Sequence, residues 1–299
     1  MTAPATRLPD IALTALAPAI WGSTFVVSTE LLPAGHPLTL AMFRALPAGL
    51  LLLAVTRRLP QRAWIGRTLI LGALNFAIFW TLLFVAAFRL PGGIAATLGA
   101  MQALMVIGMA RGWLGTPIRA GAVVAAIAGV SGVALLLSGP VTSVDPVGVA
   151  AGLGASASMA AGTVLSRRWQ PPVGPLAVTA WQLTAGGLLL VPLALAFEPA
   201  FPVLTVANLA GMAWLGLVGA ALTYWLWFRG LARLEPAAVS ILAMMSPVTA
   251  VALGWLLLDQ HLTPLQGTGA AIVLLSVWAG QVANRAPARP ASLGERVCP

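Results

Sequence analysis

Long apolar stretches recur along the chain and are separated by short polar segments. An α-helix needs roughly 20 apolar residues to cross a hydrocarbon core of about 30 Å, and ten stretches meet that length. They run approximately over residues 11–28, 37–55, 69–88, 93–110, 119–137, 147–166, 175–196, 206–228, 237–257 and 264–284. Each is continuously apolar and lacks the alternation of membrane β-strands, which excludes a β-barrel. The pattern predicts an all-α integral membrane protein with ten transmembrane helices.

The composition points to the same class of protein. Of the 299 residues, 60% are hydrophobic and 8% are charged, and the mean hydropathy is +0.96, whereas about a quarter of a soluble domain is charged. The net charge of +9 would suit nucleic acid only if the basic residues gathered on one face. They recur between the apolar runs instead, so the expected partner is the lipid bilayer, and no nucleic acid is expected.

The basic residues, all of them arginines, also predict an orientation. With the N-terminus in the cytoplasm, fourteen of the 16 fall in inner segments, Arg89 falls in an outer loop, and Arg44 lies inside the second span. Cytoplasmic loops of membrane proteins carry the excess of Lys and Arg. No cleavage site of small residues follows the first span, so that span is expected to be retained. We expect a multi-pass protein of the inner (plasma) membrane with both termini in the cytoplasm.

The two halves of the sequence resemble each other. Residues Pro37–Leu52, PLTLAMFRALPAGLLL, align with Pro175–Leu190, PLAVTAWQLTAGGLLL, at an offset of 138, and an offset of 144 pairs Trp80 with Tyr224. Five spans per copy is an odd number, so the copies must cross the membrane in opposite directions. We therefore expect two inverted five-helix repeats, residues 1–140 and 141–284, and a cytoplasmic tail, residues 285–299; the alternative is a shared Leu, Ala and Gly composition.

Small residues follow one face of the fifth and tenth predicted spans. Gly121, Ala125 and Gly129 are spaced by four, as are Gly267 and Ala271. Such faces let helices approach closely in lipid. The spacing predicts a static seam, either between the repeats or between two subunits.

Several short motifs resemble one transporter superfamily. They are Trp21–Phe25 (WGSTF), Arg44 after an aromatic residue, Ser246–Val248 (SPV) and Gly254–Gln260 (GWLLLDQ). Together they resemble EamA-type members of the drug/metabolite transporter superfamily, and within it most closely the YddG group of aromatic amino acid exporters. The resemblance implies ten spans around a central cavity, alternating access, and export of small metabolites. The chain departs from the family pattern at Asp259, where a glutamate is usual, and at Gln102, where a proline is usual.

The residue types inside the spans limit the chemistry. No Asp, Glu, His or Lys lies within a predicted span, whereas proton-coupled transporters commonly use such a group. This favours facilitated movement of a neutral or zwitterionic solute, with coupling through Glu30 or Asp259 at the outer rim as the alternative. A membrane enzyme would need a carboxylate pair or a histidine cluster, but His36 and His261 fall in outer turns and Cys298 is the single cysteine. We expect no enzyme activity, no catalytic residue, no cofactor and no metal.

Arg44 is the one charge well inside a predicted span, about 10 Å from its outer end at 1.5 Å per residue. One interpretation is that it snorkels outward or bonds to carbonyls near Pro47. The other is that its planar fork binds a substrate carboxylate. The repeat partner of Arg44 is Gln182, so the repeat itself does not require a charge at this position.

Aromatic, polar and thioether residues recur at mid-depth in several spans. Each taken alone could simply pack against a neighbouring helix; together they suit an amphiphilic solute in a mostly apolar pocket. By contrast Trp225, Trp227 and Trp255 fall near span ends and are expected in the interfacial belt. The candidate substrate-binding residues are Trp21, Arg44, Asn75, Phe79, Trp80, Met101, Gln102, Ser158, Met245 and Ser246.

These observations favour a secondary transporter that exports small metabolites, with amino acids that carry aromatic and hydrophobic side chains as the expected substrates. One alternative is a multidrug or other metabolite exporter of the same fold. Another, of a different class, is a membrane receptor or assembly factor that moves nothing. Solute flux in proteoliposomes separates transport from the receptor alternative.

The distribution of arginines leads to a test of topology. A reporter that is active only in the cytoplasm should be active when fused after Pro299 and silent when placed in the turn at residues 138–146. The reverse pattern of activity would show that the orientation is inverted.

Overall fold

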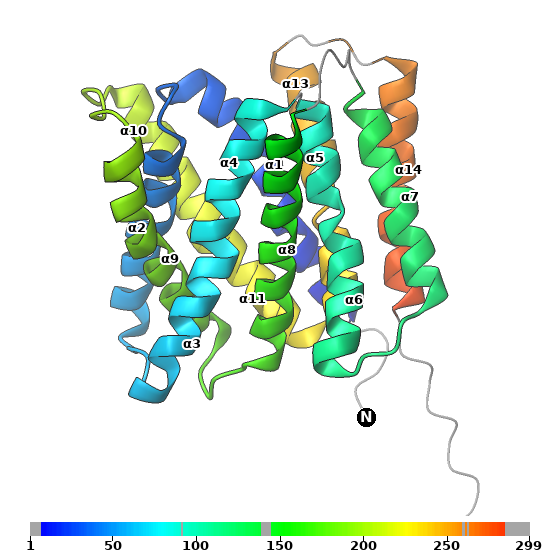
Figure 1. The fold of residues 1–299 in the computed structure, drawn as a ribbon, viewed down its shortest axis with the longest axis horizontal. Coiled ribbons are helices and arrows are strands. Elements are labelled where there is room, and N and C mark those ends of the chain that lie inside the picture. The colour runs from blue at the N-terminus through cyan, green and yellow to red at the C-terminus, as the bar shows by residue number, and fades with distance from the viewer. Residues whose placement is uncertain (1–6, 91, 139–144, 259–260, 262, 285–299) are drawn as a thin grey trace, which may run out of the picture.

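A computed structural model describes residues 7–90, 92–138, 145–258, 261 and 263–284 as one bundle of helices that run between two ends (Figure 1). The tail expected over residues 285–299 lies outside this range, as does most of the 138–146 turn. The helices of the first half are α1 (Arg7–Leu31), α2 (Pro37–Thr56), α3 (Arg62–Gly72), η2 (Ala73–Ala77), α4 (Ile78–Arg89), α5 (Gly92–Ala100), α6 (Gln102–Leu114) and α7 (Ala120–Leu136). Those of the second half are α8 (Pro146–Arg168), α9 (Pro175–Phe197), α10 (Val206–Ala213), η3 (Trp214–Leu222), α11 (Thr223–Arg233), α12 (Pro236–Leu242), α13 (Met245–Leu257) and α14 (Pro264–Ala283).

The predicted fold class is confirmed. Within the described ranges, nine continuous helical segments are long and apolar enough to cross a membrane, and the shorter apolar helix α7 completes ten spans at the predicted places. Proline occupies the first turn of α2, α8, α9, α12 and α14. Its missing N–H has no helical partner at that position and its φ suits a helix start. Proline therefore favours helix starts at these positions.

The two halves share their irregularities as well as their order of helices. The third span of each half contains a π-helical segment, η2 in one and η3 in the other. The fourth span of each half is broken, at Met101 between α5 and α6 and at Ala243 and Met244 between α12 and α13. Arg167 donates to a carbonyl of α11, and Arg233 of α11 donates to Asp10, so the end of α8 and the start of α1 lie at the same end of the bundle. The first helices of the two halves therefore run in opposite directions.

Two seams join the halves. The helices α2 and α9 pack together on one side of the bundle and α7 and α14 on the other, as Figure 1 shows. Glycine makes the first seam close: a Cβ on Gly49 would lie 2.5 Å from the backbone nitrogen of Thr184, and one on Gly187 would lie 2.7 Å from the Cβ of Leu46. At the second seam, a Cβ on Gly269 would lie 2.3 Å from the nitrogen of Leu136. The seam predicted for the fifth and tenth spans thus lies between the repeats, but on the tenth span the close approach is at Gly269, and the predicted Ala271 is exposed.

The remaining spans pack between these seams and cross from one half to the other. The first helix of the chain, α1, packs against α11 and α13, and its counterpart α8 packs against α4 and α6. A core of alanine, leucine and aromatic side chains fills the space between α1, α2, α4, α9 and α11. Trp227 is completely buried there, so its expected place in the interfacial belt is wrong, whereas Trp255 is 54% exposed.

The α2–α9 seam can be tested with matched glycines. Gly49→Ala should destabilise the protein by about 1–3 kcal/mol, because its new methyl group meets backbone that cannot move aside. Gly108→Ala is the control, since Gly108 is exposed in α6 and nothing lies within 4 Å of its added Cβ. Both substitutions gain the same helix propensity. Equal melting temperatures of the two variants in detergent would contradict close packing at this seam.

Candidate functional site

Two amides meet deep between the halves. Asn75 of η2 donates from Nδ2 to Oε1 of Gln182 in α9 at 2.7 Å and to Oγ of Ser166 in α8 at 3.3 Å. Both amide side chains are almost completely buried. A buried amide without a partner is costly, so this contact stabilises the approach of η2 to α9.

Arg44 makes the corresponding contact from α2, the helix that packs against α9. Its Nη2 donates to the carbonyl oxygen of Gly219 in η3 at 2.7 Å. Gln182 follows Arg44 by 138 residues and Gly219 follows Asn75 by 144, the offsets that relate the two repeats. The two contacts are therefore equivalent under the internal two-fold relation. They differ in chemistry: one joins two neutral amides, and the other presents a cation.

The cation is incompletely paired by the protein. The Nε–H of Arg44 is buried, and it has no hydrogen-bond acceptor among the described residues. Its guanidinium carbon lies 5.5 Å from the ring centroid of Trp80, within the range of a cation–π interaction. A planar acceptor such as a carboxylate could engage the remaining donors of the guanidinium.

An aromatic cluster lies beside Arg44. Trp80 and Tyr224, which are repeat equivalents, have ring centroids 6.4 Å apart, and Phe76 packs edge-on to both at 5.3 and 4.7 Å. Trp21 extends the cluster, with its ring centroid 5.0 Å from that of Tyr224 and 5.1 Å from that of Trp227. Phe76, Tyr224 and Trp227 are not among the candidate residues predicted from the sequence. For Tyr224 the sequence did hold a signal, because the repeat alignment pairs it with the candidate residue Trp80.

The structure divides the candidate residues into three groups. Trp21, Arg44, Phe79 and Trp80 belong to or pack against the aromatic core, and the indole Nε1 of Trp21 donates to Oγ1 of Thr223 at 2.8 Å. Asn75 and Ser158 bond to other helices, Ser158 through its Oγ to the carbonyl of Leu74 at 2.8 Å. The other four stand at the two helix breaks: Met101, Gln102, Met245 and Ser246.

Gln102 has a feature in common with Arg44. Its Nε2 is buried and bonds to no described atom. Because α6 starts at Gln102 after the break at Met101, this amide lies where the helix is interrupted. Ser246 is in the equivalent break, and a Cβ on Gly22 of α1 would lie 2.6 Å from its carbonyl oxygen. The break in the ninth span thus lies directly against the first span.

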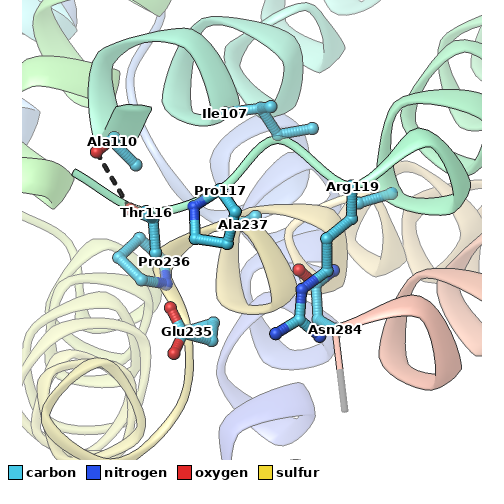
Figure 2. Close-up of a pocket in the computed structure, with 10 residues that line it drawn as sticks. Ile107, Ala110, Thr116, Pro117, Arg119, Glu235, Pro236, Ala237 and Asn284 are labelled. Atoms are coloured by element: carbon cyan, nitrogen blue, oxygen red, sulfur yellow. Dashed lines mark hydrogen bonds between the residues drawn. The ribbon is translucent and has the colours of Figure 1, made fainter. Parts of the chain in front are cut away.

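A small pocket opens at one end of the bundle, away from these residues (Figure 2). It holds about 60 Å³ and its walls include Ile107, Thr116, Arg119, Glu235 and Asn284. Thr116 donates from Oγ1 to the carbonyl of Ala110 at 2.9 Å, and Arg119 donates to the carbonyl of Ala283 at 3.1 Å. Ligand pockets typically hold roughly 300–1,000 Å³, and none of the candidate residues lines this one. It is not the candidate site.

Comparison with known proteins identifies the family. The model of the EamA-like transporter family matches the chain twice, over residues 9–138 and 146–279, so the chain belongs to this family. The protein PecM of Dickeya dadantii (strain 3937) is 41% identical over 269 residues, which cover 89% of this chain and 90% of PecM. YedA of Escherichia coli (strain K12), described as an inner membrane transporter, is 28% identical over 263 residues, 86% of each chain.

A solved structure shares the fold. The crystal structure of another protein superimposes on this chain with a TM-score of 0.78 at 19% sequence identity. The match covers 93% of this chain and 99% of the other chain. The protein is thus a multi-pass membrane transporter of the EamA family. The family match also covers each half separately, in agreement with the irregularities that the two halves share.

Proposed function

We propose that this transporter exports amino acids, including aromatic and hydrophobic ones, across the inner membrane by alternating access at a central cavity, with both termini in the cytoplasm. The observation that carries the proposal is the geometry of Arg44. It is a cation in mid-span between the two halves, with a buried Nε that no described atom accepts from, beside the Trp80 and Tyr224 rings. This combination suits a solute with a carboxylate at one end and an apolar group at the other.

Each end of such a solute has a proposed partner. The Arg44 guanidinium would bind the carboxylate, because its planar fork matches two carboxylate oxygens. Trp21, Phe79 and Trp80 would surround the side chain, since aromatic pairs add about 0.5–1.5 kcal/mol beyond burial of area. The residues at the helix breaks would complete the cavity: Met101, Gln102, Met245 and Ser246.

Asn75 and Ser158 take a supporting part in this proposal. The bonds of Asn75 to Gln182 and of Ser158 to Leu74 occupy them in the present conformation. Both would shape the wall of the cavity and could exchange partners with the polar end of a solute. Because no acidic residue or histidine lies within the predicted spans, we infer movement of the zwitterion down its own gradient.

A multidrug exporter of the same fold is the competing function. Many hydrophobic drugs are cations, and an intramembrane arginine without a neighbouring carboxylate would repel them. Proteoliposomes loaded with labelled phenylalanine, threonine or an organic cation separate these possibilities. Flux of the amino acids alone supports the proposal, whereas flux of the cation alone favours the competing function.

The aromatic side of the site makes a specific prediction. Trp80→Ala should weaken the apparent affinity for phenylalanine by roughly three- to tenfold, the equivalent of about 0.5–1.5 kcal/mol, and should change threonine flux less. Trp255→Ala is the matched control, because Trp255 is largely exposed on α13, and it should leave both fluxes unchanged. Equal losses for phenylalanine and threonine in Trp80→Ala would mean that Trp80 packs the core and does not select the substrate.

A further inference from the structure

Three charged residues are linked at the end of the bundle where α1 begins. Asp10, in the first turn of α1, pairs through Oδ1 with Nη2 of Arg229 at 2.7 Å and with Nη1 of Arg233 at 2.9 Å, both from the end of α11. The Asp10 and Arg229 side chains are only 17% and 18% exposed. This cluster, the α1–α11 ion pairs, joins the first helix of one half to the third span of the other.

A second ion pair lies where α8 begins. Asp145 caps α8 through the N–H of Val147 and pairs through Oδ2 with Nη1 of Arg89, the last residue of α4, at 2.9 Å. The hydrogen bond from Arg89 and then that from Val147 lower the pKa of the Asp145 carboxyl, so it is ionised at neutral pH. This contact, the α4–α8 ion pair, again joins the first helix of one half to the third span of the other.

The two contacts join equivalent helices of the repeat, although the two aspartates, 135 residues apart, are not themselves aligned by the repeat offsets. Arg89 and Arg233 are 144 residues apart and end α4 and α11, which are equivalent helices. Asp10 and Asp145 stand at the starts of α1 and α8, the equivalent first helices. Because the halves are inverted, the two contacts close opposite ends of the bundle (Figure 1).

We propose that the α1–α11 and α4–α8 ion pairs are alternate latches, of which one must open for the central site to reach each side of the membrane. The inference rests on the proposed alternating access, because a cavity that opens to one side at a time needs a separable contact at each end. Separating α1 from α11 opens the end that holds Asp10. Separating α4 from α8 opens the end that holds Asp145.

The latches differ in strength. At the α1–α11 end a second arginine binds Asp10, and Arg167 of α8 donates to the carbonyls of Leu231 and Ala232 at the end of α11. The α4–α8 pair is more exposed, with 49% of the Arg89 side chain and 32% of that of Asp145 in contact with solvent. Exposed ion pairs contribute about 0.2–1 kcal/mol and partly buried, hydrogen-bonded ones more. We therefore expect the α4–α8 end to open more often in the unmodified protein.

Buried reporters lie directly behind each latch. Thr14 follows Asp10 by one turn and is fully buried, and a Cβ on Gly230 of α11 would collide with it. Ala86 precedes Arg89 by one turn and is also fully buried, 3.6 Å from a Cβ placed on Gly152 of α8. Thr14→Cys and Ala86→Cys, each in a Cys298→Ser chain, therefore report opening of one end through alkylation by a water-soluble maleimide.

The test is the alkylation rate of each reporter in full-length protein reconstituted in nanodiscs, without any substrate. Asp10→Asn should raise the rate at Thr14→Cys by about tenfold and leave Ala86→Cys unchanged or slower. Asp145→Asn should raise the rate at Ala86→Cys by up to about fivefold and leave Thr14→Cys unchanged. Arg233→Gln keeps the Arg229 pair, so its effect at Thr14→Cys should be smaller than that of Asp10→Asn. Exchange of the outer charges, Arg89→Asp with Asp145→Arg, should restore protection of Ala86→Cys.

The outcome separates latches from static ion pairs. If the alkylation rate rises at both cysteines in either single variant and the melting temperature falls, the ion pairs only stabilise the fold and the proposal is overturned. Unchanged rates at both reporters overturn it as well. Because no amino acid is added, these results do not depend on whether phenylalanine is transported, and failure of the substrate assignment would show only in the flux assay.

Discussion

Polar groups in the hydrocarbon core have no water to bind, so each needs a partner within the protein. This constraint accounts for the contacts between the two halves. Asn75 donates to Gln182, and Arg44 donates to the carbonyl of Gly219 at the equivalent place. One inverted relation thus generates two polar contacts from different residues. Each contact leaves a buried donor without an acceptor among the described residues, Nε2 of Gln182 in one and Nε of Arg44 in the other. Only the arginine donor carries a positive charge, and that asymmetry motivates the proposed site.

The same inverted relation separates static from mobile parts in the proposed mechanism. Glycines bring the backbones of α2 and α9, and of α7 and α14, into contact at both sides of the bundle, and such close seams resist opening. The spans between them cross from half to half, and charged residues at their exposed ends hold them together. Ion pairs near the ends of the bundle can separate at lower cost than interlocked backbones, the exposed α4–α8 pair more easily than the partly buried α1–α11 pairs.

The sequence predicted the architecture because length and periodicity encode it directly. Ten apolar runs and two constant offsets were enough for the spans and the inverted order. They could not predict which way each helix is rotated, because lipid-facing and buried positions are both apolar. Trp227 was therefore expected at the interface but lies in the core. The π-helical segments η2 and η3 also have no marker in the sequence, so the contact of Asn75 with Gln182 was missed, although both residues had been noted.

The claim that Arg44 binds the substrate carboxylate is tested most directly by measuring equilibrium binding to the purified protein. Dissociation constants of phenylalanine and of its amide, which lacks the carboxylate, can be compared in the unmodified chain and in Arg44→Gln. We expect the unmodified protein to bind phenylalanine more tightly by about tenfold, the equivalent of roughly 1.4 kcal/mol, and Arg44→Gln to bind the two ligands alike. The account would be contradicted if the preference for phenylalanine survived in Arg44→Gln, or if the unmodified protein showed no preference.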